Sequence, residues 1–304
     1  MLQFQPVGFG QRVVETALGA MAYYTPTAAP WVNEAQIEED RPPLVFLHSL
    51  GGGSSAYEWS QVYPAFAADY RVIAPDLIGW GQSAHPVHDY RAEDYFEAIA
   101  ILLEKVAQRP AVVAATSLTA SIVVRLAIQR PELFSQLFLV SPSGYEDFGN
   151  GYQQGIAARL AGTPGLDNLI YTLGAANEGA IANFMATFLF ASPDRITPEM
   201  IAAYLASATQ RQAEYAALAS LKGALCCDLS RYIGQLQIPT MFVWGKESRF
   251  NRPEIGQRLA ALSEAVIKPI KVIPDAGVLP HLELPAIVIS LLRKFLASSS
   301  SPCP

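Results

Sequence analysis

Ser117 is the residue whose type and position most clearly suggest chemistry. It follows the apolar run AVVAAT (111–116) and precedes a helical pattern (121–130). On a sharp turn between a buried strand and a helix, a serine hydroxyl stands above the sheet edge, where the helix N-terminus suits an oxyanion. Serine is equally suited to capping a helix. From this residue alone, a nucleophile and a helix cap both remain open.

Nucleophilic chemistry at Ser117 would need two further side chains. A serine hydroxyl attacks well only when an adjacent base removes its proton and an acid orients that base. The chain has four histidines, which are His48, His85, His88 and His281. The last of these lies in the otherwise apolar loop PDAGVLPHLELP (274–285).

Other chemistries have less support in the sequence. The run GGG (51–53) is not followed by the Gly-Lys-Ser/Thr of a phosphate loop, and no spacing of His, Asp, Glu and Cys is typical of a metal site. We therefore expect no cofactor and no metal. Cys226 and Cys227 are adjacent and Cys303 lies near the end, which gives no disulfide framework. These cysteines, and a start unlike a signal peptide, predict a cytoplasmic protein.

The composition favours a large core. Hydrophobic residues make up 51% of the 304 residues and charged residues 16%, whereas about 25% is typical for charged residues. Apolar surface is therefore expected, facing an apolar small molecule, a protein partner or, peripherally, a membrane. The net charge of −6 without basic clusters argues against nucleic acid. No apolar run reaches the roughly 18 residues of a membrane span.

The elements that would position these residues alternate regularly. Short apolar runs that end in Gly, Ser, Asp or Pro predict strands buried on both faces at 43–48, 71–76, 111–116, 137–142, 240–245 and 270–275. Helical stretches such as 94–108 and 121–130 lie between them, and 12–24 could form a hairpin. This alternation predicts a mostly parallel sheet with helices on both faces and ligands at the strands' carboxyl ends.

The alternation stops after Ser143. Residues 145–235 are rich in Ala and Leu, with a helical pattern at 197–221 whose start fits Thr197. We expect a helical cap at 145–235, inserted into a core made of 1–144 and 236–304. Aromatic residues of the cap, such as Phe184 and Phe188, fit a helix core better than a ligand pocket, although some could line one.

Five motifs in order carry a resemblance to a known family. They are LVFLHSLGGGSSAYEW (44–59), APDLIGWGQSAHP (74–86), the Ser117 turn, IPTMFVWGKESRF (238–250) and PDAGVLPHLELP. Over nearly its whole length the sequence resembles the α/β-hydrolase superfamily. The resemblance implies an eight-stranded, mostly parallel sheet with an inserted cap. It also implies an oxyanion hole made by the N–H groups of Leu50 and Leu118, and places His48, Trp80 and His281 near the pocket.

The turn around Ser117 departs from the family pattern. The family usually has Gly-x-Ser-x-Gly, where this chain has Ala115 and Thr119 at the two glycine positions. Alanine is a small change, but the β-branched Thr119 is expected to crowd the turn or force it open. Ser49 stands where the oxyanion loop usually has glycine.

The acid and base positions depart further. The family's acid position corresponds to Ser248 and its catalytic histidine position to Val278. Valine cannot accept a proton. His281 matches a second family histidine and is expected to anchor its loop. Substitute acids could be Glu247, Glu146 or Asp147, and substitute bases His85, His88 or His281.

These departures favour a catalytically degenerate member of the family, which retains Ser117 and binds an apolar small molecule or a protein partner. The alternative is an active serine esterase or thioesterase that uses Ser117 with a relocated acid and base. A third possibility is an assembly or membrane-associated factor without a ligand pocket.

Overall fold

The computed structural model describes residues 2–32, 41–149, 171 and 176–299. Within these residues eight strands form one sheet in the order β1-β2-β4-β3-β5-β6-β7-β8. Their bounds are β1 (Phe9–Thr16), β2 (Gly19–Pro26), β3 (Pro43–Leu47), β4 (Arg71–Pro75), β5 (Ala111–Thr116), β6 (Phe134–Val140), β7 (Thr240–Gly245) and β8 (Ile267–Ile273). The hairpin β1–β2 and the β2–β4 pair are antiparallel, and the remaining pairs are parallel. The predicted sheet and hairpin are confirmed.

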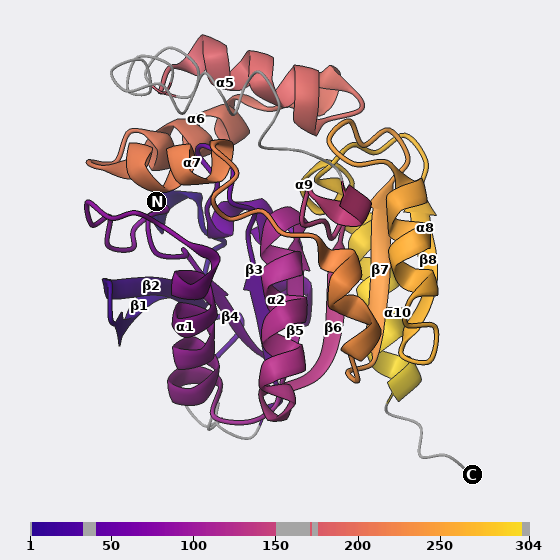
Figure 1. The fold of residues 1–304 in the computed structure, drawn as a ribbon. Coiled ribbons are helices and arrows are strands. Elements are labelled where there is room, and N and C mark those ends of the chain that lie inside the picture. The colour runs from indigo at the N-terminus through magenta and orange to yellow at the C-terminus, as the bar shows by residue number, and fades with distance from the viewer. Residues whose placement is uncertain (1, 33–40, 150–170, 172–175, 300–304) are drawn as a thin grey trace.

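Helices cover both faces of the sheet (Figure 1). They include α1 (Ala92–Leu102), α2 (Ser117–Gln129), α8 (Pro253–Ala261), α9 (Pro280–Glu283) and α10 (Pro285–Ser299). Strand residues alternate between two cores, so that Val113 packs with α1 and α2 whereas Val112 packs with α10. Most side chains of the central strands are apolar and buried on both faces, which explains the continuous apolar runs in the sequence.

The strand β8 differs from the prediction. It begins at Ile267 rather than 270, and most of its side chains are exposed or half-buried. It pairs only with β7 and therefore forms the edge of the sheet. Exposed lysines at 268 and 271 are typical of an edge strand, because charge discourages pairing with another chain.

Helices α5 (Glu178–Phe184), α6 (Pro198–Ala208) and α7 (Ala213–Leu221) lie between β6 and β7 in the chain and at one end of the sheet (Figure 1). The predicted start is confirmed, because the Thr197 side chain accepts a hydrogen bond from the Met200 N–H. The helical pattern at 197–221 is divided, since Gln212 has a left-handed backbone (φ 67°) that a helix cannot continue. Much of the expected cap, residues 150–170 and 172–175, lies outside the described residues.

Candidate active site

Ser117 occupies a tight turn directly after β5, as the first residue of α2. Its backbone is left-handed, with φ +54°, and the residue is 5% exposed. A left-handed backbone is uncommon for a residue other than glycine and indicates local strain held by the surrounding structure. The turn therefore has the strained geometry expected of a nucleophile position, although neither flanking position has glycine.

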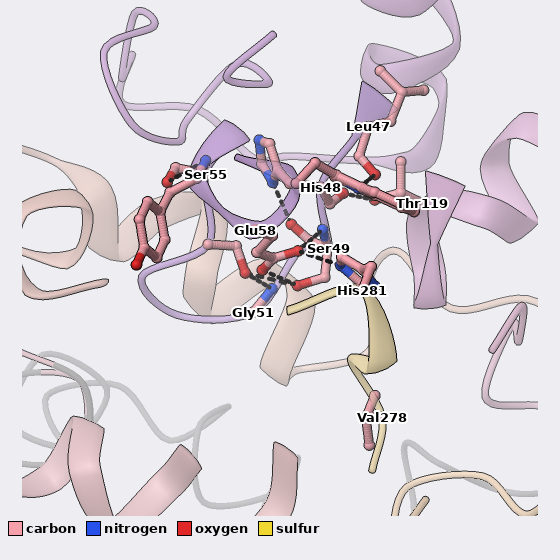
Figure 2. Close-up of polar contacts among 12 residues, drawn as sticks. Leu47, His48, Ser49, Gly51, Ser55, Glu58, Thr119, Val278 and His281 are labelled. Atoms are coloured by element: carbon pink, nitrogen blue, oxygen red, sulfur yellow. Dashed lines mark hydrogen bonds and ion pairs between the residues drawn. The ribbon is translucent and has the colours of Figure 1, made fainter. Parts of the chain in front are cut away.

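Thr119 does not force this turn open, contrary to the expectation from its β-branched side chain. The side chain is buried, and its hydroxyl donates a hydrogen bond of 2.7 Å to the carbonyl oxygen of His48 (Figure 2). This bond connects α2 to the end of β3, so the side chain that replaces glycine gains a partner on the neighbouring strand.

The hydroxyl of Ser117 has a tyrosine as its partner. Ser117 Oγ lies 2.6 Å from the hydroxyl oxygen of Tyr145, close enough for a hydrogen bond in which either group can donate. Sequence reasoning did not find Tyr145, because 28 residues separate it from Ser117 and only the fold brings them together. All four histidines are described, and none has a hydrogen bond to Ser117.

Two of the four imidazoles bind groups other than Ser117, and the other two have ring nitrogens without a hydrogen-bond partner among the described residues. His48 accepts from the Leu77 N–H at 2.9 Å through Nε2, so its Nδ1 carries the proton and donates to the Ser49 carbonyl. His88 lies 3.0 Å from the Asp94 carboxylate. Burial lowers the pKa of His85, and its Nε2 has no partner among the described residues. None of these three is placed to serve Ser117 as a base.

His281 lies on the short helix α9 and is fully buried. Its ring stacks on Trp59, with centroids 4.0 Å apart and planes 19° apart. Neither ring nitrogen has a hydrogen-bond partner within the described part of the chain, and Nε2 is 3.9 Å from the nearer oxygen of Glu58. Burial lowers its pKa, and the nearby Glu58 carboxylate opposes this effect. His281 therefore holds its place by packing.

Glu58 is a buried carboxylate that sequence reasoning missed. It accepts hydrogen bonds from the Ser49 N–H (2.8 Å), the Ser49 hydroxyl (2.7 Å) and the Tyr204 hydroxyl (3.0 Å). Figure 2 shows Ser49, Glu58 and His281 pointing toward one another, with Val278 lying apart. Desolvation raises its pKa, but His281, His48 and the Ser49 N–H outweigh that cost and bring it to about 2. Glu58 is thus ionised and joins three segments.

The positions where the family has its histidine and its acid are occupied here by Val278 and Ser248. Val278 is buried, and its N–H donates to the Leu189 carbonyl at 2.9 Å. Ser248 is also buried, and its hydroxyl donates to the Asn251 side-chain oxygen at 3.0 Å. The Asn251 amide donates in turn to the Ser141 carbonyl. Ser248 therefore belongs to a hydrogen-bond network that fixes loops.

The three substitute acids are also placed away from an imidazole. Glu247 is exposed and Glu146 is half-buried. Asp147 is buried and accepts from the Ser143 hydroxyl (2.6 Å) and the Leu229 N–H (2.9 Å). Burial raises the pKa of this carboxyl above its ordinary value. Across the described residues, none of the three forms a pair with a histidine.

The two expected oxyanion donors stand at places where the backbone leaves an N–H available. Among the residues that the structure describes, the Leu50 N–H has no hydrogen-bond partner. Leu118 lies in the first turn of α2, where a helix offers no acceptor. Ser49, which replaces a family glycine, helps to hold this loop through its bonds to Glu58 and Ser54.

A pocket of about 360 Å³ lies beside Tyr145. It is lined by Ser143, Tyr145, Asp147, Phe250, Asn251, Arg252, Glu254 and Ile255. His48, Trp80 and His281, which were expected near a pocket, do not line it and are almost fully buried. Trp80 instead donates to the Tyr95 hydroxyl at 3.1 Å. No cluster of metal-ligating side chains occurs in the described ranges.

Exposed aromatic rings border this pocket. Phe250, which lines it, stacks on Phe188 with centroids 5.7 Å apart, and the two residues are 43% and 41% exposed. Phe184 packs beside both rings. Phe188 therefore lies largely at the surface, not in a helix core as expected. None of the described helices is long and apolar enough to cross a membrane.

The fold agrees with the comparisons. The chain belongs to the alpha/beta hydrolase family, whose model matches residues 44–291. An uncharacterized protein of Mycobacterium tuberculosis is 32% identical to this chain over 123 residues. The match covers 40% of this chain and 34% of that protein, so it spans about a third of that relative's length. The uncharacterized hydrolase YugF of Bacillus subtilis is 28% identical over 224 residues, covering 73% of this chain and 78% of that protein.

Solved structures confirm the fold. The carboxylesterase CesB of Bacillus subtilis has a TM-score of 0.74, with 18% identity over 98% of this chain and 94% of that chain. At this identity the likeness concerns the fold alone.

Proposed function

We propose that this protein is a catalytically degenerate alpha/beta hydrolase that binds a small, largely apolar molecule in the cytoplasm without hydrolysing it. One observation carries the proposal. The Ser117 hydroxyl is hydrogen-bonded to a tyrosine at 2.6 Å, while valine stands at the family's histidine position. A general base typically contributes 10²–10⁴-fold to rate, and here no imidazole is in reach to supply it.

The pocket beside Tyr145 supports binding. Its volume of about 360 Å³ falls at the lower end of the range for small-molecule sites, roughly 300–1,000 Å³. Exposed aromatic rings at its margin favour an apolar ligand, because stacking on them removes apolar surface from water. We propose further that residues 145–235 act as a cap over the core, and that the N–H groups of Leu50 and Leu118 remain only as vestiges of an oxyanion hole.

Rebuilding the family's two missing side chains tests this proposal. We would measure p-nitrophenyl ester hydrolysis at pH 7 by the natural protein, by Ser117→Ala and by the double variant Ser248→Asp/Val278→His. We expect the first two to be equally slow and the double variant to gain turnover that a further Ser117→Ala change removes. Turnover by the natural protein that depends on Ser117 would contradict the proposal. Thermal unfolding of the double variant controls for misfolding.

One observation favours a second candidate, an active esterase in which Tyr145 is the base. The same 2.6 Å contact places its oxygen where a base would stand. The base must be a phenolate, the form of a tyrosine that becomes more abundant as the pH rises. This candidate predicts Ser117-dependent turnover that rises about tenfold per pH unit and disappears in Tyr145→Phe. A flat profile excludes it.

A further inference from the structure

Tyr145 contacts Ser117 and also lines the pocket. The tyrosine hydroxyl is bonded to Ser117, whereas the residue lines the pocket and packs edge-on against Phe250, with centroids 6.3 Å apart. Ser117 is 5% exposed and is not among the lining residues. A ligand in this pocket therefore meets Tyr145, the loop after β7 and the start of α8, whereas Ser117 does not line the pocket.

One positively charged residue, Arg252, lines the pocket without a partner for its charge among the described residues. Arg252 is exposed and has no hydrogen bond or ion pair to any described residue. The nearby Arg249, by contrast, donates to the carbonyl groups of Thr187 and Ala186. An unpaired guanidinium at the edge of a pocket suits a carboxylate, which it can bind through two parallel hydrogen bonds.

The two acidic residues of the lining, Asp147 and Glu254, only partly oppose the binding of an anion at Arg252. The oxygens of Asp147 already accept from Ser143, Gly144 and Leu229, so they are turned to the protein. Glu254 is exposed, where water weakens its repulsion of a second anion. Arg252 is therefore the lining residue that we expect to favour a negatively charged ligand.

The apolar part of the lining is next to this cation. Phe250 and Ile255 line the pocket, and Phe188 extends the aromatic surface outward by stacking on Phe250. We propose that the pocket beside Tyr145 binds a small carboxylic acid with an aromatic or acyl body, the carboxylate on Arg252 and the body on Phe250. This inference rests on the proposed function, because it specifies the ligand of a protein that binds without turnover.

Isothermal titration calorimetry with two probes of the same body tests the inference. 4-Phenylbutyrate is ionised at pH 7, whereas 4-phenylbutan-1-ol is neutral. We expect the acid to bind at least about tenfold more tightly than the alcohol, as a charge-assisted pair allows. Arg252→Met should remove this preference, and the matched control Arg249→Met should keep it. Phe250→Ala should weaken both probes.

Three results would overturn the inference: equal affinity for the two probes, a preference that survives in Arg252→Met, or no binding of either probe. The Arg252 side chain is exposed and makes no hydrogen bond or ion pair within the described part of the chain, so Arg252→Met is expected to fold normally, which its thermal midpoint checks. The proposed function fails separately, through ester turnover that depends on Ser117, and the outcome of one experiment does not decide the other.

Discussion

At the scale of single residues, hydrogen bonds explain why a turn with unusual residues keeps its family shape. Thr119 and Ser49 replace glycines, and each donates its hydroxyl to a buried acceptor, the His48 carbonyl and the Glu58 carboxylate. A buried polar side chain is tolerated when it is paired and costly when it is not. The two substitutions therefore fit because their partners are present.

Replacing Thr119 with Val tests this directly. Valine has nearly the same shape but cannot donate, so the buried His48 carbonyl loses a partner. We expect the free energy of unfolding to fall by about 1–3 kcal/mol, measured by urea denaturation. Thr119→Ser, which keeps the hydroxyl, should lose less. If Thr119→Val is as stable as the natural protein, the hydrogen bond does not stabilise the turn.

Glu58 predicts a specific dependence of stability on pH. Its pKa falls from 4.5 to about 2 on folding, so the folded state favours the ionised form. The stability that this provides is complete above pH 4.5 and is lost as the pH falls from 4.5 toward 2. A shift of this size corresponds to about 3 kcal/mol.

The variant Glu58→Gln should therefore be less stable by about that amount at pH 7, and the gap should narrow as the pH falls. Urea denaturation of both proteins at pH 7, 5 and 3 measures the gap. Tyr204→Phe, which removes one of the donors and keeps the charge, serves as the control and should retain the acid loss. A gap that stays constant down to pH 3 would contradict the assignment.

At the scale of elements, one buried carboxylate ties the chain between β6 and β7 to the core. Glu283, at the end of α9, accepts from the N–H groups of Gly277 (2.7 Å), Ala191 (3.0 Å) and Ser192 (3.0 Å). Arg195 donates to the same carboxylate at 2.8 Å. A Cβ on residue 277 would collide with the Leu189 carbonyl oxygen, so glycine is required there. The segment that carries Val278 is thus fixed.

Glu283→Gln should loosen this connection. An amide cannot accept at its nitrogen, so at least one donor is left unpaired and Arg195 loses the buried negative charge of its partner. We expect a loss of about 2–3 kcal/mol and faster hydrogen exchange at the amides of Gly277, Ala191 and Ser192. The control is Asp275→Asn, on the exposed partner of Arg195, which should cost less than about 1 kcal/mol. Unchanged exchange in Glu283→Gln would contradict the role.

At the scale of the whole molecule, the sequence predicts what depends on local pattern. Continuous apolar runs such as 111–116 identify the central strands, and motif order places Ser117 after β5. Tyr145, Glu58 and Glu283 could not be found in this way. Their roles come from partners far away in sequence, such as Tyr204 for Glu58, and no local spacing encodes such contacts.

The edge strand β8 is a second case in which the local sequence pattern does not determine the structure. The end of its sequence, from residue 270, resembles a buried strand. The burial of the side chains, however, depends on whether other strands pair on both sides of β8. The pocket is likewise a product of assembly, because it combines residues after β6 with the loop after β7. Local pattern therefore gives the framework, and the packing of distant segments decides the chemistry.

The central claim is that the Ser117 hydroxyl is not activated, and labelling with a fluorophosphonate probe measures this most directly. The natural protein and Ser117→Ala would be incubated with the probe at pH 7 and examined by intact-mass spectrometry, with an active serine esterase as positive control. We predict no adduct on either protein while the esterase is fully labelled. A stoichiometric adduct on the natural protein that is absent from Ser117→Ala would contradict the account.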